Sequence, residues 1–242
     1  MTRNDLVTGS STGIGRETAR LFAKKGFNVI INCSSNVESL SDLQAEIMAL
    51  GVDCLAFVGD VGQYDEIDRL FNEMAKKNLI PDIIINNAGI SHVGLLQDMS
   101  IGEWNRVIST NLTAAFNTSK LAIPYFLQKG HGKIINISSM WGSAGASCEV
   151  AYSASKGGLN TFTRALAKEL APMNIQVNAV AFGVTDTRMN DFLTAEEKRA
   201  LLEEIPAGRM CSAKEAAEII YSVASLNEYV TGQIINADGG YI

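Results

Sequence analysis

The sequence predicts an α/β fold: one doubly wound domain over residues 1–242, with a seven-stranded parallel sheet and helices on both faces. Short apolar segments alternate with helix-compatible segments along the whole chain, as expected when helical crossovers connect parallel strands. A glycine-rich turn follows the first apolar segment, and 242 residues suffice for one large domain. No repeat or linker interrupts the pattern, which is that of the Rossmann fold.

The composition narrows the classes of partner. The formal net charge is −6 at pH 7 and no basic block is present, so we expect neither nucleic acid nor a membrane as a partner. Four cysteines without C-x-x-C spacing and two distant histidines predict no metal site. With no signal peptide and no apolar run of about 18 residues, the sequence indicates a cytoplasmic protein that acts on a small molecule.

The first strand, which starts at Asp5, leads into a turn typical of dinucleotide binding. The run T-G-S-S-T-G-I-G joins this strand to an amphipathic helix. Glycines let the backbone approach a pyrophosphate, and a helix start offers free N–H groups and the positive end of the helix dipole. Because the spacing G-x-x-x-G-x-G differs from the common G-x-G-x-x-G, a helix-entry loop without a ligand is the alternative. The candidate cofactor-binding residues of this turn are Gly9, Ser11, Thr12, Gly13, Ile14 and Gly15.

The second strand, N-V-I-I-N, ends in a segment that bears on the choice of cofactor. NAD-selective sites place an acidic residue near this point to accept from the ribose hydroxyls, and here none precedes Glu38. The sequence therefore favours NADP(H). Since this segment has no arginine or lysine, we expect neutral side chains to bind the 2′-phosphate. The candidates on this side of the cofactor are Thr12, Asn32, Ser34, Ser35 and Asn36.

Two further strand ends carry candidate cofactor residues. Asp60, beside Val61, is placed to accept from the adenine amino group, and an aspartate that caps the turn before the helix over 64–77 is an equal alternative. The next strand, I-I-I, runs into N-N-A-G, whose small residues suit a backbone lying against a flat ligand. We therefore include Asn87, Ala88 and Gly89 among the cofactor residues.

Helical periodicity then runs from about Ile101 to Leu127 and carries Asn111. Asparagine is unfavourable in the middle of a helix, because its side chain competes for backbone hydrogen bonds. Its presence there indicates a functional role, and a solvent-facing asparagine is the alternative.

The stretch from Ser138 to Lys156 carries the predicted chemistry. A strand K-I-I-N-I ends in two serines, which places a hydroxyl at the carboxyl edge of the sheet, where open α/β folds bind ligands. Tyr152 and Lys156 stand four apart at the start of a helix, so both side chains lie on one face. An ammonium about 4 Å from the phenol contributes on the order of 4 kcal/mol at an effective dielectric of about 20. Because that free energy brings a tyrosine pKa from about 10 to about 7, we expect Lys156 to lower the pKa of Tyr152.

A polar, charged segment follows the next strand, I-Q-V-N-A-V. We expect residues at about 184–210, including the run T-A-E-E-K-R-A-L-L-E-E, to form a mobile lid over the substrate site. Ser212 to Glu215 form a capping box that starts the last helix, and Q-I-I-N-A-D-G-G is a final strand and turn.

Together these motifs resemble the short-chain dehydrogenase/reductase family over essentially the whole chain. The shared features are T-G-x-x-x-G-I-G, N-N-A-G, a helical asparagine, a serine at a strand end and Y-x-x-x-K. The resemblance implies that Tyr152 is the general acid/base and that Lys156 holds the nicotinamide ribose and lowers the tyrosine pKa. It implies that Ser139 orients the substrate carbonyl and that Asn111 holds a water in a proton relay. Ser139 is chosen over Ser138 because the family's serine lies thirteen residues before the tyrosine.

The resemblance also implies that Gly183, Val184 and Thr187 meet the carboxamide of the nicotinamide and the pyrophosphate. Phe182 stands where the family usually has proline, which is a departure in this loop. Relatives of this kind are usually homotetramers joined through the helices that correspond here to Ile101–Leu127 and Tyr152–Leu170.

Within the family, the chain resembles the bacterial 3-oxoacyl-[acyl-carrier-protein] reductases of fatty acid biosynthesis. This implies NADPH-dependent reduction of a ketone on acyl carrier protein to a secondary alcohol. The run M-W-G-S-A-G-A-S-C-E-V-A-Y resembles instead a subgroup that reduces the 5-aminopentanone group on elongation factor P. A cationic substrate amine would explain Glu149, and a solvated loop carboxylate is the alternative. A third possibility, an NADP-binding sensor or scaffold without turnover, is disfavoured because all four catalytic positions are intact.

Overall fold

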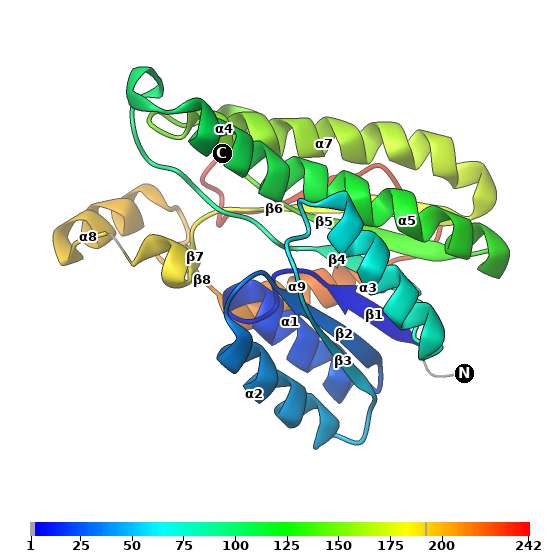
Figure 1. The fold of residues 1–242 in the computed structure, drawn as a ribbon. Helices are drawn as coiled ribbons and strands as arrows, with labels where there is room; N and C mark the ends of the chain where they lie inside the picture. Colours follow the sequence, from blue (N-terminus) through cyan, green and yellow to red (C-terminus); the bar gives the residue numbers. More distant parts are fainter. Residues whose placement is uncertain (1–2, 192) are drawn as a thin grey trace.

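The structure, a computed structural model, describes residues 3–191 and 193–242. At its centre is a seven-stranded sheet in which every pair of neighbours runs parallel, as predicted (Figure 1). The strands, in their order across the sheet, are β3 (Cys54–Val58), β2 (Asn28–Cys33), β1 (Asn4–Val7), β4 (Ile83–Asn86), β5 (Gly132–Ser139), β6 (Ile175–Phe182) and β9 (Ile234–Ala237).

Helices cover both faces of this sheet, which confirms the predicted doubly wound α/β fold (Figure 1). The helices are α1 (Gly13–Lys24), α2 (Val37–Met48), α3 (Tyr64–Lys76), α4 (Ile101–Ile108), α5 (Ala114–Lys129), α6 (Trp141–Ala144), α7 (Val150–Leu170), α8 (Ala195–Glu204) and α9 (Ala213–Ala224). Short 3₁₀ turns are η1 (Leu96–Asp98), η3 (Ala171–Met173) and η4 (Arg188–Asn190).

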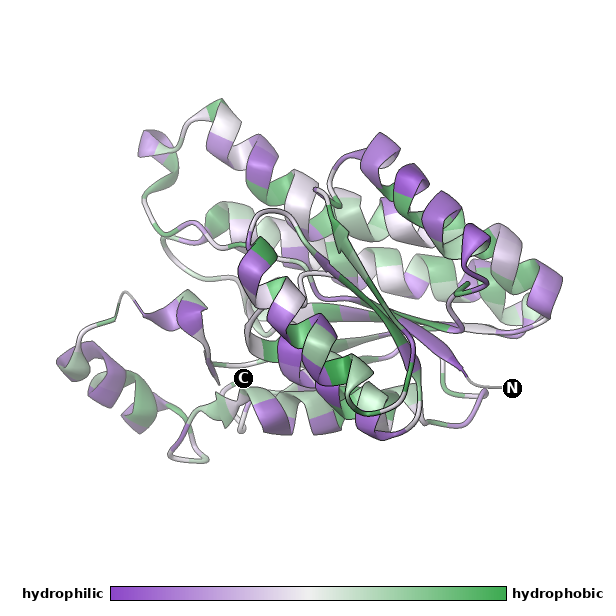
Figure 2. Cartoon of the chain, turned by 60° about the horizontal axis from the view of Figure 1, so that its bottom comes forward, coloured by the Kyte–Doolittle hydropathy of each residue, from purple (hydrophilic) through white to green (hydrophobic). Residues whose placement is uncertain are grey.

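Two apolar cores form because adjacent strand residues point to opposite faces. In β1, Val7 packs into the core made with α1, α2 and α9, and Leu6 packs into the core made with α3, α5 and α7. Every residue of β1, β4 and β6 is buried, as expected for parallel strands covered on both sides. Figure 2 shows this division as apolar strands inside and polar outer sides of the helices.

The strand order reverses beside β1, which pairs with both β2 and β4. The loops that leave the carboxyl ends of β1, β4, β5 and β6 therefore meet at one edge of the sheet. These loops carry the glycine-rich turn, the N-N-A-G run, Ser139 and Gly183. The topology thus brings together four motifs that are far apart in the sequence.

The predicted helix from Ile101 to Leu127 contains a feature without a sequence signal. Between α4 and α5 the chain forms a π-helical turn, η2 (Ser109–Thr113). Such a turn inserts an extra residue and rotates the side chains that it carries. Asn111 lies in it and is buried, so the alternative of a solvent-facing asparagine is wrong.

The segment predicted to be a lid begins and ends in a small second sheet, in which β7 (Thr185–Asp186) pairs with β8 (Cys211–Ser212). Within the predicted lid, the charged run forms α8, which begins with a Thr194–Glu197 capping box. No residue of α8 is buried, and Figure 1 shows this helix away from the central sheet. Phe192, also within the predicted lid, lies outside the described residues.

The helix start that the sequence predicted is observed, as a Ser212–Glu215 capping box at α9. Within the described part of the chain, no helix has the length and apolar character that crossing a bilayer requires. Residues 3–191 and 193–242 also contain no group of three or more His, Cys, Asp or Glu side chains that could hold a metal ion.

Candidate active site

The glycine-rich turn and the N-N-A-G run are locked together. Gly9 has φ +61°, and a Cβ there would lie 2.8 Å from the Cα of Ala88, so only glycine fits this close approach. The Thr8 hydroxyl accepts from the backbone N–H groups of Asn87 and Ala88, each at 3.0 Å. Asn87 Nδ2 donates to the carbonyls of Thr8 at 2.9 Å and Gly9 at 3.0 Å. The two predicted cofactor segments therefore form one rigid unit.

The start of α1 faces the segment after β6. Gly13, with φ +56°, would place a Cβ 3.5 Å from Cγ2 of Thr187. Thr12 is the N-cap of α1, and its side chain makes no capping hydrogen bond. The helix start therefore keeps unpaired N–H groups and a spare hydroxyl, with a second hydroxyl opposite, which suits a pyrophosphate. Ser11, Ile14 and Gly15 lie in the same turn, and Gly15 packs against the side chain of Asn87.

The residues after β2 divide into internal and exposed groups. Asn32 is buried: its Oδ1 accepts from Gly9 N at 3.2 Å, and its Nδ2 donates to the Gly59 carbonyl at 3.0 Å. It supports the glycine-rich turn from within the protein. Ser34 and Ser35 are exposed, and Asn36 caps α2, accepting from Ser39 N at 3.4 Å. The two serines and the start of α2 thus remain accessible to an anion.

Arg16 is a residue that the sequence reasoning missed, because we looked for a cation only in the segment after the second strand. From the first turns of α1 its Nη1 donates to the Ser39 carbonyl at 2.8 Å and to the Ser11 carbonyl at 3.3 Å. Its Nη2 lies 2.6 Å from a carboxylate oxygen of Glu46. A guanidinium therefore stands between the glycine-rich turn and α2, partly neutralised by that carboxylate. An arginine one helical turn past a glycine-rich loop was the available signal.

Asp60 forms the turn before α3. Its Oδ1 accepts from Gly62 N at 2.9 Å, and its carbonyl accepts from Gln63 N at 2.9 Å. The turn-forming alternative is therefore present, and contact with an adenine remains a prediction. Val61 is buried in the core below the turn.

Asn111 holds the loop after β4 against α7. Its Oδ1 accepts from Ile90 N at 2.8 Å, and its Nδ2 donates to the Ile90 carbonyl at 2.9 Å and to Ser155 Oγ at 3.0 Å. A Cβ on Gly89 would lie 3.5 Å from both Asn111 Oδ1 and Lys156 Nζ. The asparagine, the glycine and the lysine therefore meet at one point.

Ser139, Tyr152 and Lys156 converge at the end of β5, and all three are buried. Ser139 Oγ accepts from Trp141 N at 3.2 Å and lies near the Tyr152 phenol, whose pKa it lowers. Lys156 Nζ donates to the Ile137 carbonyl at 2.7 Å and lies 5.6 Å from the centre of the Tyr152 ring. The serine hydroxyl and the phenol can both reach one carbonyl oxygen, as acid catalysis at that oxygen requires.

The predicted lowering of the Tyr152 pKa by Lys156 is wrong for the protein's own groups. The pKa of Tyr152 is raised to about 12, mainly by burial and to a smaller extent by the Glu149 carboxylate, while the Ser139 hydroxyl works against the rise. Burial also lowers the pKa of Lys156 to about 8. The prediction failed because it included the attraction between ammonium and phenolate but not the cost of removing both charges from water. Lys156 also directs its ammonium to a backbone carbonyl.

Glu149 is not a fully solvated loop carboxylate. It is half-buried at the start of α7, where its Oε2 accepts from Ser91 Oγ at 3.2 Å. Burial raises its pKa above the ordinary value, and the Ser91 hydrogen bond works against that rise. Glu149 stands three residues before Tyr152, and its carboxylate raises the pKa of that phenol.

Phe182, which stands where the family usually has proline, is accommodated within the central sheet. Phe182 is buried, pairs with Ser139 on one side and Ala237 on the other, and accepts from Met140 N at 2.9 Å. A Cβ on Gly183 would lie 2.7 Å from the Cα of Asp238, so the backbone here must stay bare. The Val184 carbonyl accepts from Cys211 N at 3.0 Å, which fixes the base of the segment leading to Thr187.

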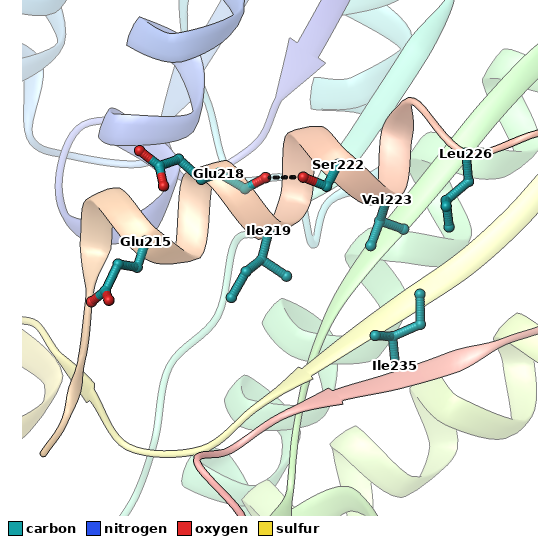
Figure 3. A pocket seen from close by; sticks show the side chains of 7 residues that line it. All are labelled: Glu215, Glu218, Ile219, Ser222, Val223, Leu226 and Ile235. Atoms are coloured by element: carbon teal, nitrogen blue, oxygen red, sulfur yellow. Dashed lines mark hydrogen bonds between the residues drawn. The ribbon is translucent and has the colours of Figure 1, made fainter. Parts of the chain in front are cut away.

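A shallow groove elsewhere on the molecule lies between α9 and β9 (Figure 3). Apolar side chains line it, and Ser222 Oγ donates to the Glu218 carbonyl at 2.8 Å on its rim. None of the predicted catalytic residues lines this groove, so the groove is not part of the candidate active site. The lining residues are Glu215, Glu218, Ile219, Ser222, Val223, Leu226 and Ile235.

Comparisons with known proteins identify the family of this chain. The profile of the family described as short chain dehydrogenase matches residues 4–198. Over 241 residues the chain is 39% identical to 3-oxoacyl-[acyl-carrier-protein] reductase FabG of Staphylococcus aureus, covering 99% of this chain and 98% of that protein. It is 33% identical over 243 residues to the uncharacterized oxidoreductase YmfI of Bacillus subtilis, covering 100% of this chain and 99% of that protein.

A solved structure from Agrobacterium tumefaciens, assigned as a gluconate dehydrogenase, superposes with a TM-score of 0.93 at 34% identity. The match covers 99% of this chain and 95% of that one. The family profile, the relatives and the solved structure therefore agree, and the chain belongs to the short-chain dehydrogenase/reductase family of oxidoreductases.

Proposed function

We propose that this oxidoreductase uses NADPH to reduce a ketone to a secondary alcohol, and that its substrate is a 3-oxoacyl group on acyl carrier protein. The observation that carries the reaction is the convergence of Ser139, Tyr152, Lys156 and Asn111 at the carboxyl edge of the sheet. The proposed substrate rests on the 39% sequence identity to a reductase that is named for that substrate.

The residues present fit a dinucleotide. Gly9 lets the glycine-rich turn lie directly against Ala88, Thr12 at the start of α1 makes no capping hydrogen bond, and Thr187 lies beside Gly13. These groups would hold the pyrophosphate, with Asn87, Ala88 and Gly89 along the nicotinamide riboside and Gly183 and Val184 at the carboxamide. Lys156 would hold the ribose. When bound, the reduced nicotinamide supplies the hydride.

The protein's own groups supply the proton. With a pKa of about 12 the Tyr152 phenol is protonated at neutral pH, which is the state that reduction needs. Ser139 orients the carbonyl oxygen and Tyr152 donates a proton to that oxygen as negative charge develops on it. Lys156, beside the phenol and mostly cationic at pH 7, stabilises the phenolate that is left. Asn111 would hold the water that returns a proton.

Preference for NADPH rests on the segment after β2. No carboxylate precedes Glu38 there, and Ser34 and Ser35 are exposed at the start of α2. Arg16 adds a cation near this loop, although it is shared with Glu46. We expect NADPH to bind at least tenfold more tightly than NADH, as measured by quenching of protein fluorescence.

The second candidate function, reduction of the aminopentanone group on elongation factor P, is favoured by Glu149. Its carboxylate is half-buried, hydrogen-bonded to Ser91 and close to Tyr152, so a substrate ammonium could pair with it. An acidic carrier protein would instead be disfavoured by this charge.

We further propose that residues 184–210 cover the substrate and that the chain forms a homotetramer through α4, α5 and α7. Glu204, at the end of α8, accepts a hydrogen bond from the Tyr241 hydroxyl. The Tyr241 ring packs edge-on against Trp141, with 5.6 Å between the ring centres. This supports a lid, because Trp141 lies two residues after Ser139. Exposed apolar side chains on the helices, such as Ile101 and Phe116, support an interface.

The test measures NADPH oxidation with two substrates side by side: an acetoacetyl thioester, and elongation factor P carrying the aminopentanone group. We expect efficient reduction of the thioester. A strong preference for the modified factor, lost in Glu149→Gln, would replace the first substrate with the second. No turnover with either, combined with tight NADPH binding, would leave the sensor as the function.

A further inference from the structure

Ser138, the serine that the catalytic assignment leaves aside, is as buried as its neighbour Ser139. Its Oγ donates to Oδ1 of Asn160 at 2.6 Å and lies 3.5 Å from the carbonyl of Lys156. Asn160 is also buried and stands on α7 one turn after Lys156. The pair therefore joins the end of β5 to the turn of α7 that carries the catalytic lysine.

Two other contacts connect β5 and the loop after it to the same turn of α7. Lys156 Nζ donates to the carbonyl of Ile137, the residue before Ser138. A Cβ on Gly142 would lie 2.8 Å from the carbonyl carbon of Lys156 and 2.9 Å from Nδ2 of Asn160, so the loop after Ser139 packs directly on this turn. The turn of α7 that carries Lys156 therefore packs tightly against β5 and the loop that follows it.

The opposite side of this turn of α7 is held by a separate set of hydrogen bonds. Ser155 Oγ accepts from Asn111 Nδ2 at 3.0 Å and donates to the Tyr152 carbonyl at 2.7 Å. That contact ties the turn to η2, which carries Asn111 but not Ser139. The spacing between Ser139 and the Tyr152–Lys156 pair must therefore be set from the β5 side.

We propose that Ser138 and Asn160 are positioning residues, whose hydrogen bond fixes Tyr152 and Lys156 relative to Ser139. The proposal rests on the reductase function above. Neither residue touches the reacting atoms; they act by holding one turn of helix at a fixed depth against the strand. Because a misplacement of about 1 Å can cost roughly 100-fold in rate, a single buried hydrogen bond at this place matters for turnover.

The experiment compares Ser138→Ala, Asn160→Ala and the double variant with a matched control, Thr163→Val. Thr163 Oγ1 accepts from Asn136 Nδ2 at 2.8 Å, so it also joins β5 to α7 through a buried hydrogen bond, about two helical turns beyond Lys156. Each variant is first checked for its melting temperature and its Kd for NADPH. The kcat and KM for the ketone are then measured well below the melting temperature.

We expect kcat to fall about 10- to 100-fold in Ser138→Ala and Asn160→Ala, with the ketone KM within about twofold. The double variant should be no slower than the slower single variant, because both changes remove one interaction. Ser138→Thr, which keeps the hydroxyl, should recover most of the rate. Thr163→Val should lose a similar amount of stability and keep kcat within about twofold.

A kcat loss in Ser138→Ala and Asn160→Ala no larger than in Thr163→Val would overturn the proposal, since the pair would then only stabilise the fold. If Ser138→Ala does not fold, the same comparison is made with Asn160→Ala. A crystal structure of Ser138→Ala gives a readout without turnover: we expect a longer distance between Lys156 Nζ and the Ile137 carbonyl. An unchanged distance would contradict positioning, whereas an inactive wild-type enzyme would contradict the proposed function alone.

Discussion

The two ends of the central sheet are both rich in polar side chains, yet they use them differently. At the amino end, Asn4 N donates to Asp82 Oδ2 at 2.8 Å, and Lys129 Nζ lies 2.6 Å from Asp82 Oδ1. These groups bond to each other and to backbone carbonyls. At the carboxyl end, the Thr12 hydroxyl makes no capping hydrogen bond, and the buried Ser139 and Tyr152 lie together at the end of β5. The same sheet therefore uses polar groups for connection at one end and for chemistry at the other.

Buried polar groups differ between the ends in a second way. Around the catalytic turn, Ser138, Asn111 and Ser155 each have hydrogen-bond partners within 3.0 Å. Near the amino end, Asp5 in β1 is fully buried, and neither carboxyl oxygen has a partner among the residues that the structure describes. The carboxyl edge is preorganised, whereas the amino edge contains an uncompensated group.

The largest effect should come from the carboxyl end. Replacing Tyr152 with Phe removes the proton donor and leaves the ring, its burial and the fold in place. We expect kcat to fall by about 1,000-fold, within the range for general acid catalysis, with Kd for NADPH within about twofold. Steady-state kinetics and NADPH titration check this. Retention of more than a tenth of the activity would show that another group donates the proton.

A change at Asn111 should affect both stability and turnover. Asn111→Leu leaves the Ile90 backbone groups and Ser155 without their partner in a buried place. We expect the free energy of unfolding to drop by about 3 kcal/mol and kcat to fall more than tenfold. Urea denaturation and kinetics at 20 °C measure both. A stable but slow variant would mean that Asn111 acts mainly in the proton relay.

A change at Asp5 should stabilise the protein without affecting catalysis. Burial raises the pKa of Asp5 well above its ordinary value, so the folded protein binds this proton more tightly than the unfolded chain does. Asp5→Val should raise the free energy of unfolding at pH 7 by about 2 kcal/mol, because it removes buried polar atoms that lack partners.

The same substitution has a predictable pH dependence. The unfolded chain releases the Asp5 proton above about pH 4, and the raised pKa means that the folded protein releases it only at higher pH, so the wild type loses stability as pH rises through this range. The gain from Asp5→Val should therefore be larger at pH 8 than at pH 5. Asp5→Asn, which cannot titrate, is the control. Equal gains at both pH values would show that Asp5 is ionised or hydrated in the folded protein.

The smallest effect should come from the partly exposed ion pair at the amino end. Lys129→Ala removes a pair with Asp82 in which the lysine side chain is 28% exposed. We expect a loss of at most about 1 kcal/mol and no change in kcat or KM. Thermal melting and kinetics check this. A loss as large as that of Asn111→Leu would mean that the two ends of the sheet contribute equally to stability.

The sequence by itself determined the order of strands and helices, the glycine-rich turn, the capping box at α9, and the catalytic candidates. These features follow from local rules: hydrophobic periodicity, the backbone freedom of glycine, and side chains four apart on a helix. They need only neighbouring residues to be recognised.

Tertiary structure decided the rest, because it depends on which segments meet. The π-helical turn that turns Asn111 inward, the reach of Arg16 to α2 and the bond from Ser138 to Asn160 join residues that no local pattern connects. The raised pKa of Tyr152 could not be predicted from the sequence for the same reason. Burial depends on the whole fold, and desolvation of the phenol outweighs a single nearby charge.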